Sequence, residues 1–253
     1  MRPIRTVIPG ILLTLLLVAL SACGKGAAPS GTSHPPTPST PSTPATASTA
    51  ASPSPTAAAP VNTPGAAETV LSSRVSYPWH WPNDVNTPAN IQHSYPVPPL
   101  PQVIAIGAGD HPGGTGQRPY DRMSFTFSTA FPSYQIRFVS KLVSDPSGRA
   151  IPLAGDGVLQ VTFHQAQGHA ASGAPSIVTQ PPAGLGLVRM VRWAPAGDFE
   201  GVLTYGIGIA WPNPRSNPQF AVRAIEVEQV TAQGQHRYIV AIDIDATSAS
   251  GQH

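Results

Sequence analysis

Met123-Ser124-Phe125-Thr126-Phe127 decides the fold class of this chain, because its side chains alternate between apolar and polar. Residues that alternate with a period of two place every second side chain on the same face of an extended strand. The same period recurs in Tyr134-Gln135-Ile136-Arg137-Phe138 and in Leu159-Gln160-Val161-Thr162-Phe163. One apolar and one polar face are typical of a strand that covers a core on one side and meets water on the other. The sequence therefore predicts an all-β domain.

Further strand-like segments follow on the C-terminal side, at residues 187–193, 199–209, 220–227 and 238–244. Turn-forming residues separate such segments, as in Asp145-Pro146-Ser147-Gly148. Between Phe220-Ala221-Val222 and Ile225-Glu226-Val227 the apolar phase shifts by one residue, which predicts a β-bulge. About seven or eight short antiparallel strands within about 150 residues favour a β-sandwich, with a closed barrel as the alternative.

The N-terminus has the features of a bacterial secretory signal. Arg2 and Arg5 precede a short apolar run, and Leu20-Ser21-Ala22-Cys23 closes it. These four residues resemble the lipobox of bacterial lipoproteins, which implies that Cys23 receives a diacylglycerol and becomes the new N-terminus. We therefore expect a signal peptide at residues 1–22 and a lipid anchor on the extracytoplasmic face of the cell membrane. An uncleaved anchor helix and a simple secretory signal are the alternatives.

Charge and cysteine content exclude several classes of function. The formal net charge is +2, from 14 Lys and Arg against 12 Asp and Glu. Loss of Arg2 and Arg5 with the signal peptide would leave the two signs balanced. No cluster of Lys or Arg remains that could follow a phosphate backbone, so nucleic-acid binding is not expected. Cys23 is the only cysteine, so the fold must be held by its core and not by disulfides.

Composition divides the rest of the chain into segments. Residues 23–70 contain the lipidated Cys23 and a tract that is almost entirely Pro, Ser, Thr, Ala and Gly, which lacks the large apolar groups of a core. We predict a disordered tether there, because proline favours extended polyproline II. Residues 71–100 are expected to form an irregular lead-in rich in proline and aromatics. Residues 101–246 are expected to form the sandwich, and residues 247–253 a disordered tail.

Three tryptophans are candidate ligand contacts. Trp79 and Trp81 lie in Tyr77-Pro78-Trp79-His80-Trp81-Pro82, and Trp211 follows a strand-like segment. Tryptophan rings either bury a large area against a core or, when exposed, stack on the rings of sugars. The sequence leaves both interpretations open for Trp79 and Trp81.

A pair of charged residues precedes the first strongly alternating strand. Asp121-Arg122 is placed to form an ion pair across the sheet with Glu200 or Asp243, which would help to set strand register. Glu200 interrupts an apolar run, so its carboxylate must either reach solvent or meet an arginine. Asp121, Arg122 and Glu200 are therefore the candidate structural ion pair.

No catalytic or metal-binding arrangement stands out. The glycine-rich segment 107–116 lacks the Lys-Ser/Thr of a phosphate loop, which favours an inter-strand turn. His164 and His169 lack the glutamate of a zinc-binding helix, and Asp243 and Asp245 are expected on a solvated strand face. An envelope hydrolase or metal-dependent enzyme would require these four residues to converge with a third ligand in a cleft.

Short motifs follow one another in order from Pro119-Tyr120-Asp121-Arg122, through Pro132–Val139 and Asp198–Leu203, to Tyr238–Ile244. This series resembles the AMIN-like domain of actinobacterial lipoproteins and secreted proteins, over about residues 100–246. The resemblance implies a β-sandwich related to AMIN domains, which are non-catalytic envelope modules that help to place a partner at peptidoglycan. The protein is therefore expected to bind peptidoglycan or an envelope protein, without catalysis and without a cofactor. A structural lipoprotein that takes no small ligand is a further alternative.

Overall fold

The computed structural model describes residues 68–212 and 219–247. The expected signal peptide at residues 1–22, Cys23, the tether as far as residue 67 and the tail beyond residue 247 lie outside these described residues. Every regular element in the described part of the chain is a β-strand. No helix there is long and apolar enough to cross a membrane.

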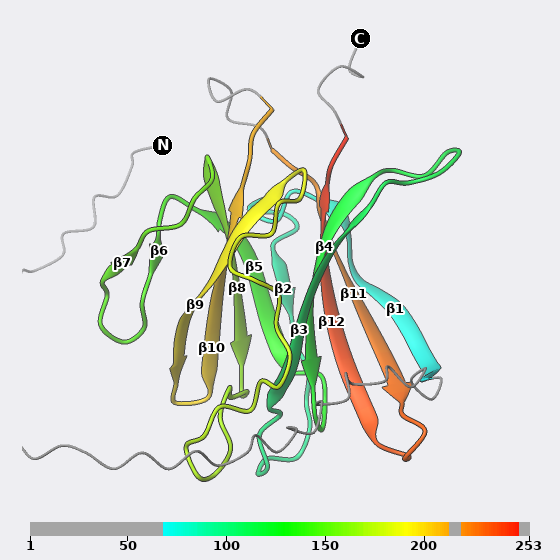
Figure 1. Ribbon diagram of the computed structural model, residues 1–253, viewed down its shortest axis with the longest axis vertical. Helices are drawn as coiled ribbons and strands as arrows, with labels where there is room; N and C mark the ends of the chain where they lie inside the picture. Colours follow the sequence, from blue (N-terminus) through cyan, green and yellow to red (C-terminus); the bar gives the residue numbers. More distant parts are fainter. Residues whose placement is uncertain (1–67, 213–218, 248–253) are drawn as a thin grey trace, which may run out of the picture. The chain divides into compact units, whose positions relative to one another are not determined.

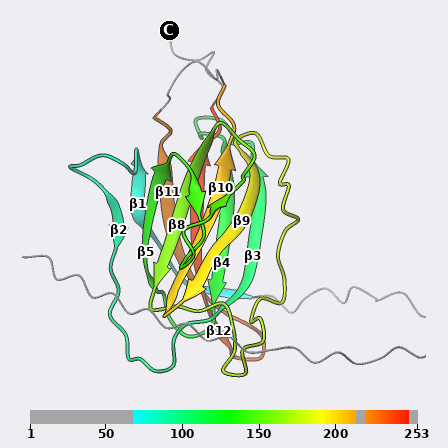
Figure 2. The same cartoon turned by 90° about the vertical axis from the view of Figure 1, so that its left-hand side faces the viewer.

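Two five-stranded antiparallel sheets face each other (Figures 1 and 2). The first sheet has the order β1 (Thr69–His80), β11 (Val222–Val230), β12 (His236–Asp245), β4 (Tyr120–Phe127) and β3 (Val103–His111). The second sheet has the order β2 (Ala89–Ile91), β5 (Ser133–Val139), β8 (Gly157–His164), β10 (Val202–Ile209) and β9 (Met190–Phe199). A small hairpin is formed by β6 (Leu142–Val143) and β7 (Ala150–Ile151). The β-sandwich prediction is confirmed, and the strands beyond the expected seven or eight are short or lie at sheet edges.

The alternating residues of the sequence form the core between the sheets. Met123, Phe125 and Phe127 of β4 are fully buried, and the polar residues between them are partly exposed. The Phe163 ring of the opposite sheet lies 5.0 Å from the Phe125 ring and 4.9 Å from the Phe127 ring, in edge-to-face arrangements. Aromatic pairs prefer this geometry, so the two sheets meet through a packed aromatic centre.

The range 71–100 is not an irregular lead-in throughout, because it contains most of β1 and all of β2. β1 accommodates Pro78 because it is the edge strand of its sheet and needs no partner on its outer side. Its pairing with β11 is interrupted between Val75 and Tyr77 and between Tyr77 and His80. These irregularities bend β1 so that Tyr77 is buried in the core, with only 4% of its surface exposed.

The β-bulge expected between Val222 and Ile225 is absent from the pairing of β11 with β12. β11 pairs with β12 in continuous register from Val222 to Val230. The residue in phase with Val222 and Ala224 is therefore Glu226, which takes a buried position, and Ile225 lies on the other face. A carboxylate therefore occupies an inward position where the apolar pattern of the sequence predicts an apolar residue.

The glycine-rich segment 107–116 is only partly a turn. Residues Gly107 to His111 form the end of β3 and pair with β4 from Ser124 to Tyr120. The connection between the two strands is therefore residues 112–119 alone. At the end of β3, the His111 ring stacks on the Tyr120 ring of β4 at 4.4 Å.

The long segment 165–189 closes one open side of the sandwich, between the edge strands β3 and β9 (Figure 2). Near β3, the Val103 N–H donates to the Gln167 carbonyl at 3.0 Å, and the Val178 N–H donates to the Ile104 carbonyl at 2.9 Å. Near β9, the Trp193 N–H donates to the Ala183 carbonyl at 2.9 Å. This segment satisfies backbone groups of both edges, which would otherwise be free to pair with another chain.

Candidate functional site

Trp81 is positioned by the turn that follows β1. Next to it, the Asn83 amide nitrogen donates to the Phe138 carbonyl at 2.8 Å, and the Phe138 N–H donates to the Asn83 side-chain oxygen at 2.6 Å. The Asn83 side chain thus continues the hydrogen bonding of β5 as a neighbouring strand would. This contact holds the turn against the end of the second sheet.

Trp211 is positioned by the end of β10. Its backbone N–H donates to the Asp156 carboxylate at 2.8 Å, and its indole ring packs over Gly157. A Cβ atom at residue 157 would lie 2.9 Å from the indole nitrogen, so the ring position depends on this glycine. The Asp156 contact therefore holds the backbone of Trp211, and Gly157 leaves room for its ring.

Trp81 and Trp211 line one cavity of about 420 Å³, which we call the tryptophan groove. The other lining residues are apolar or carry short polar groups: Asn83, Phe138, Val139, Ser140, Asp156, Gly157 and Val158. Both tryptophans are partly exposed. Aromatic rings beside a few oriented polar groups are typical of sites for sugars and other amphipathic small molecules. The structure therefore brings together two of the three candidate tryptophans.

Trp79 lies apart from the tryptophan groove, on the outer face of the first sheet. The Arg223 guanidinium lies 4.6 Å from the centre of the Trp79 ring, and the Arg118 guanidinium lies 5.1 Å from it. The Tyr120 ring meets Trp79 edge-on at 6.0 Å. Trp79 is still within β1, whereas Trp81 comes after its end. The three candidate tryptophans do not form one surface.

Of the two expected partners, Asp243 forms an ion pair with Arg122 and Glu200 does not, and Asp121 takes no part in that pair. Arg122 and Arg223 lie opposite Asp243 on either side of it, and both guanidinium groups donate to its fully buried carboxylate at 2.6 Å. The hydrogen bond to Asp243 raises the pKa of Arg122 above its usual value. Glu200 lies in the exposed turn between β9 and β10 with a φ of 50°, and no ion pair found among the described residues includes it.

Asp121 faces the opposite way from Arg122, since neighbouring residues of a strand point to opposite faces. It is 1% exposed, and its carboxylate accepts hydrogen bonds from the backbone N–H groups of Arg189 and Met190, the latter at 2.9 Å. Asp121 therefore joins the first sheet to the start of β9 in the second sheet.

The residues required by the hydrolase hypothesis are divided between separate places. His164 is exposed at the end of β8, and His169 forms a hydrogen bond with Asp198 at 2.6 Å. Asp243 and Asp245 lie in β12 of the other sheet, where Asp245 pairs with Arg118 at 2.6 Å. Within residues 68–212 and 219–247, no group of three or more His, Cys, Asp or Glu side chains could hold a metal ion.

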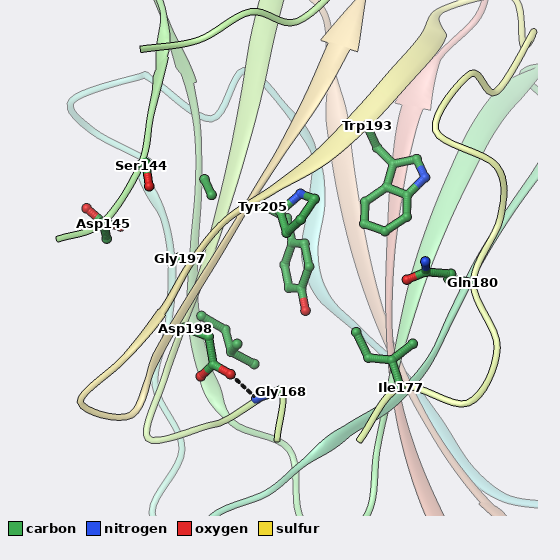
Figure 3. Close-up of a pocket in the computed structure, with 12 residues that line it drawn as sticks. Ser144, Asp145, Gly168, Ile177, Gln180, Trp193, Gly197, Asp198 and Tyr205 are labelled. Atoms are coloured by element: carbon green, nitrogen blue, oxygen red, sulfur yellow. Dashed lines mark hydrogen bonds between the residues drawn. The ribbon is translucent and has the colours of Figure 1, made fainter. Parts of the chain in front are cut away.

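A second cavity, which the sequence reasoning did not identify, lies beside β9 and behind segment 165–189. We call it the edge pocket (Figure 3). It has a volume of about 340 Å³, and Trp193, Tyr205, Asp198 and Gln180 are among its lining residues. Burial and the nearby Asp198 carboxylate raise the pKa of Tyr205 above its usual value. The sequence contains one sign of this pocket: Tyr205 is the only residue with a polar side-chain group on the inward face of β10.

Comparison with known proteins identifies one family. The family model described as AMIN-like domain matches residues 102–244. No curated protein and no solved structure matches the chain. The matched range extends from the start of β3 almost to the end of β12, so it includes Trp211 and the edge pocket but excludes Trp79 and Trp81.

Proposed function

We propose that this chain, which belongs to the AMIN-like domain family, is a membrane-anchored lipoprotein that binds peptidoglycan through the tryptophan groove. Family membership supports a binding domain of the cell envelope that is related to peptidoglycan. The lipid anchor at Cys23, the extracytoplasmic location and the non-catalytic mode of action are further parts of the proposal.

The observation that carries this proposal is the meeting of Trp81 and Trp211 in one groove. A glycan strand presents sugar rings with apolar faces, and hydroxyl and amide groups at their rims. Indole rings pack against such faces, and polar side chains at the rim orient the sugar. One carboxylate oxygen of Asp156 accepts a hydrogen bond from the backbone N–H of Trp211, and the other can accept one from a sugar hydroxyl.

The sequence before the domain suits attachment to a membrane below a thick wall. If Cys23 carries a lipid, the tether between it and β1 is about 45 residues long and could reach on the order of 100 Å as extended polyproline II. That reach would allow the domain to meet glycan strands away from the lipid surface.

Sedimentation with purified insoluble peptidoglycan tests the proposal, with the full-length protein in detergent. We expect the wild-type protein to sediment, and Trp81→Ala or Trp211→Ala to weaken binding about tenfold, because each removes a large buried contact. Trp79→Ala is the matched control, since it removes the same side chain outside the groove, and it should bind as the wild type does. Failure of the wild type to sediment, or equal binding by all three variants, would contradict the proposal.

An envelope protein is the second candidate partner, and the surroundings of Trp79 favour it. Trp79, Tyr120, Arg118 and Arg223 are residue types that dominate the energetics of protein interfaces, and they lie together on one sheet face. If this candidate is right, crosslinking on intact cells captures a partner protein with the wild type and not with Trp79→Ala. The same variant should still sediment with peptidoglycan.

A further inference from the structure

The edge pocket is built around an irregularity in β9. β10 pairs with β9 in regular steps up to Thr204, opposite Gly197, and then shifts so that Tyr205 lies opposite Pro195. Ala196 is the extra residue of this bulge, and the strand bends there. Trp193, Pro195 and Asp198 all belong to the lining of the pocket, so the bend places residues from both of its sides around one cavity.

Tyr205 brings an unpaired hydroxyl group to this pocket. The residue is 3% exposed and its ring belongs to the core, yet its side chain lines the cavity. Its surroundings raise its pKa through burial and the charge of Asp198, without a hydrogen bond to any described residue. Figure 3 shows the ring directed toward the side of the pocket that holds Asp198. A hydroxyl group that lines a cavity and has no partner among the described residues can form a hydrogen bond with a ligand.

Asp198 offers a carboxylate with one oxygen still available. Its Oδ2 atom accepts hydrogen bonds from the Gly168 N–H at 3.0 Å and from His169 Nδ1 at 2.6 Å. Its Oδ1 atom has no hydrogen bond to a described residue, and the side chain is 30% exposed. These contacts orient Asp198 and leave it able to accept from a ligand.

The charge and shape of the lining select one class of ligand. Asp145 and Asp198 are acidic, and neither Lys nor Arg lines the pocket. An ammonium group has three donors and no acceptor, which matches a hydroxyl oxygen, a carboxylate and the rings of Trp193 and Tyr205. Ile177, Leu203 and Pro195 supply apolar walls for the methylene groups of a flexible stem.

We infer that the edge pocket binds a primary ammonium group on an aliphatic chain, such as a lysine-type side chain, with Asp198 as its charged partner and Tyr205 as a hydrogen-bond acceptor. The site is separate from the tryptophan groove, and its lining shares no residue with that groove. Loss of one binding activity therefore leaves the other as a test of folding.

Ligand-observed NMR titration of the full-length protein in detergent tests the inference. The probe is Nα-acetyl-lysine methylamide, and the comparison probe is its Nε-acetylated form, which has the same stem without the charge. We expect the charged probe to bind at least about tenfold more tightly, because only it forms a charge-assisted hydrogen bond with Asp198.

Variants locate the site. Asp198→Asn should weaken binding of the charged probe about tenfold, and Tyr205→Phe, which keeps the ring, about threefold. Asp110→Asn removes an exposed carboxylate of β3 that lines neither cavity, and it should bind as the wild type does. Thermal unfolding identifies any variant that has lost its fold. If Asp198→Asn does not fold, the affinity of Tyr205→Phe for the charged probe tests the inference. Equal affinity for the two probes, no binding of either, or unchanged affinity in the variants would overturn the inference.

Discussion

Glu226 shows how one side chain can tie the two sheets together. Its carboxylate is fully buried in β11, and it accepts hydrogen bonds from Arg74 at 2.7 Å, from His93 at 2.9 Å and from the Tyr134 hydroxyl at 3.0 Å. Arg74 belongs to β1 of the same sheet, whereas Tyr134 belongs to β5 of the other. A charge in the interior is tolerated only with such partners, so these contacts compensate for its desolvation.

We predict that Glu226→Ala lowers the free energy of unfolding by about 3 kcal/mol, because it removes one partner of a buried charged network. Glu228→Ala, two residues further along the same strand, is the matched control. Glu228 pairs with His236 at 2.7 Å near the surface, with 25% of its side chain exposed, so its loss should cost less than about 1 kcal/mol. Urea unfolding followed by circular dichroism measures both values, and similar losses would contradict a special role for Glu226.

β10 is covered on both faces, which is why all of its residues from Leu203 to Ile209 are buried. Its outer face carries Gly206 and Gly208, which the hairpin β6–β7 and the chain after it approach closely. A Cβ atom at Gly206 would collide with the Leu142 side chain, and one at Gly208 with the Ala154 backbone carbonyl. These glycines therefore allow a second layer to pack on the second sheet.

We predict that Gly208→Ala destabilises the domain by about 1–3 kcal/mol, because a backbone carbonyl cannot move aside as a flexible side chain can. Gly109→Ala in β3 is the matched control, since a Cβ atom there would meet nothing within 4 Å. That variant should be neutral or slightly stabilised. Thermal unfolding of both proteins gives the comparison, and an unaffected Gly208→Ala variant would show that the hairpin does not pack as described.

The stability of the whole domain at high pH depends on tyrosines that stay protonated in the folded state. Five of its six tyrosines have a pKa above the usual 10.0, in each case chiefly because burial disfavours the phenolate, and for Tyr95 the pKa rises to about 12. Above about pH 10 the unfolded chain loses these protons while the folded domain retains them. The unfolded state then binds fewer protons than the folded state, so the free energy of unfolding falls as the pH rises.

We predict constant stability from neutral pH to about pH 9 and a progressive loss above about pH 10. Tyr205→Phe should reduce the steepness of this loss by up to about 1.4 kcal/mol per pH unit, because one group fewer ionises on unfolding. Urea unfolding at a series of pH values measures the slope. A wild type whose stability does not change up to pH 11 would contradict this account.

The amino-acid sequence by itself determined the fold class and the inward face of most strands. Alternation is a local property, so Met123, Phe125 and Phe127 could be assigned to the core without knowledge of their partners. The family resemblance likewise depends on the order of short motifs, and the match over residues 102–244 confirms the AMIN-like domain. The secretory signal and tether are also read locally, and they stay predictions because residues 1–67 lie outside the described structure.

Only the tertiary structure decided which distant residues meet. Arg122 pairs with Asp243 instead of Glu200, and Trp81 shares a groove with Trp211 while Trp79 faces elsewhere. These outcomes depend on strand order, on register between strands far apart in sequence, and on bulges in edge strands. A shift of one residue in register exchanges the two faces of a strand, so local alternation cannot specify the contacts across a sheet or between sheets.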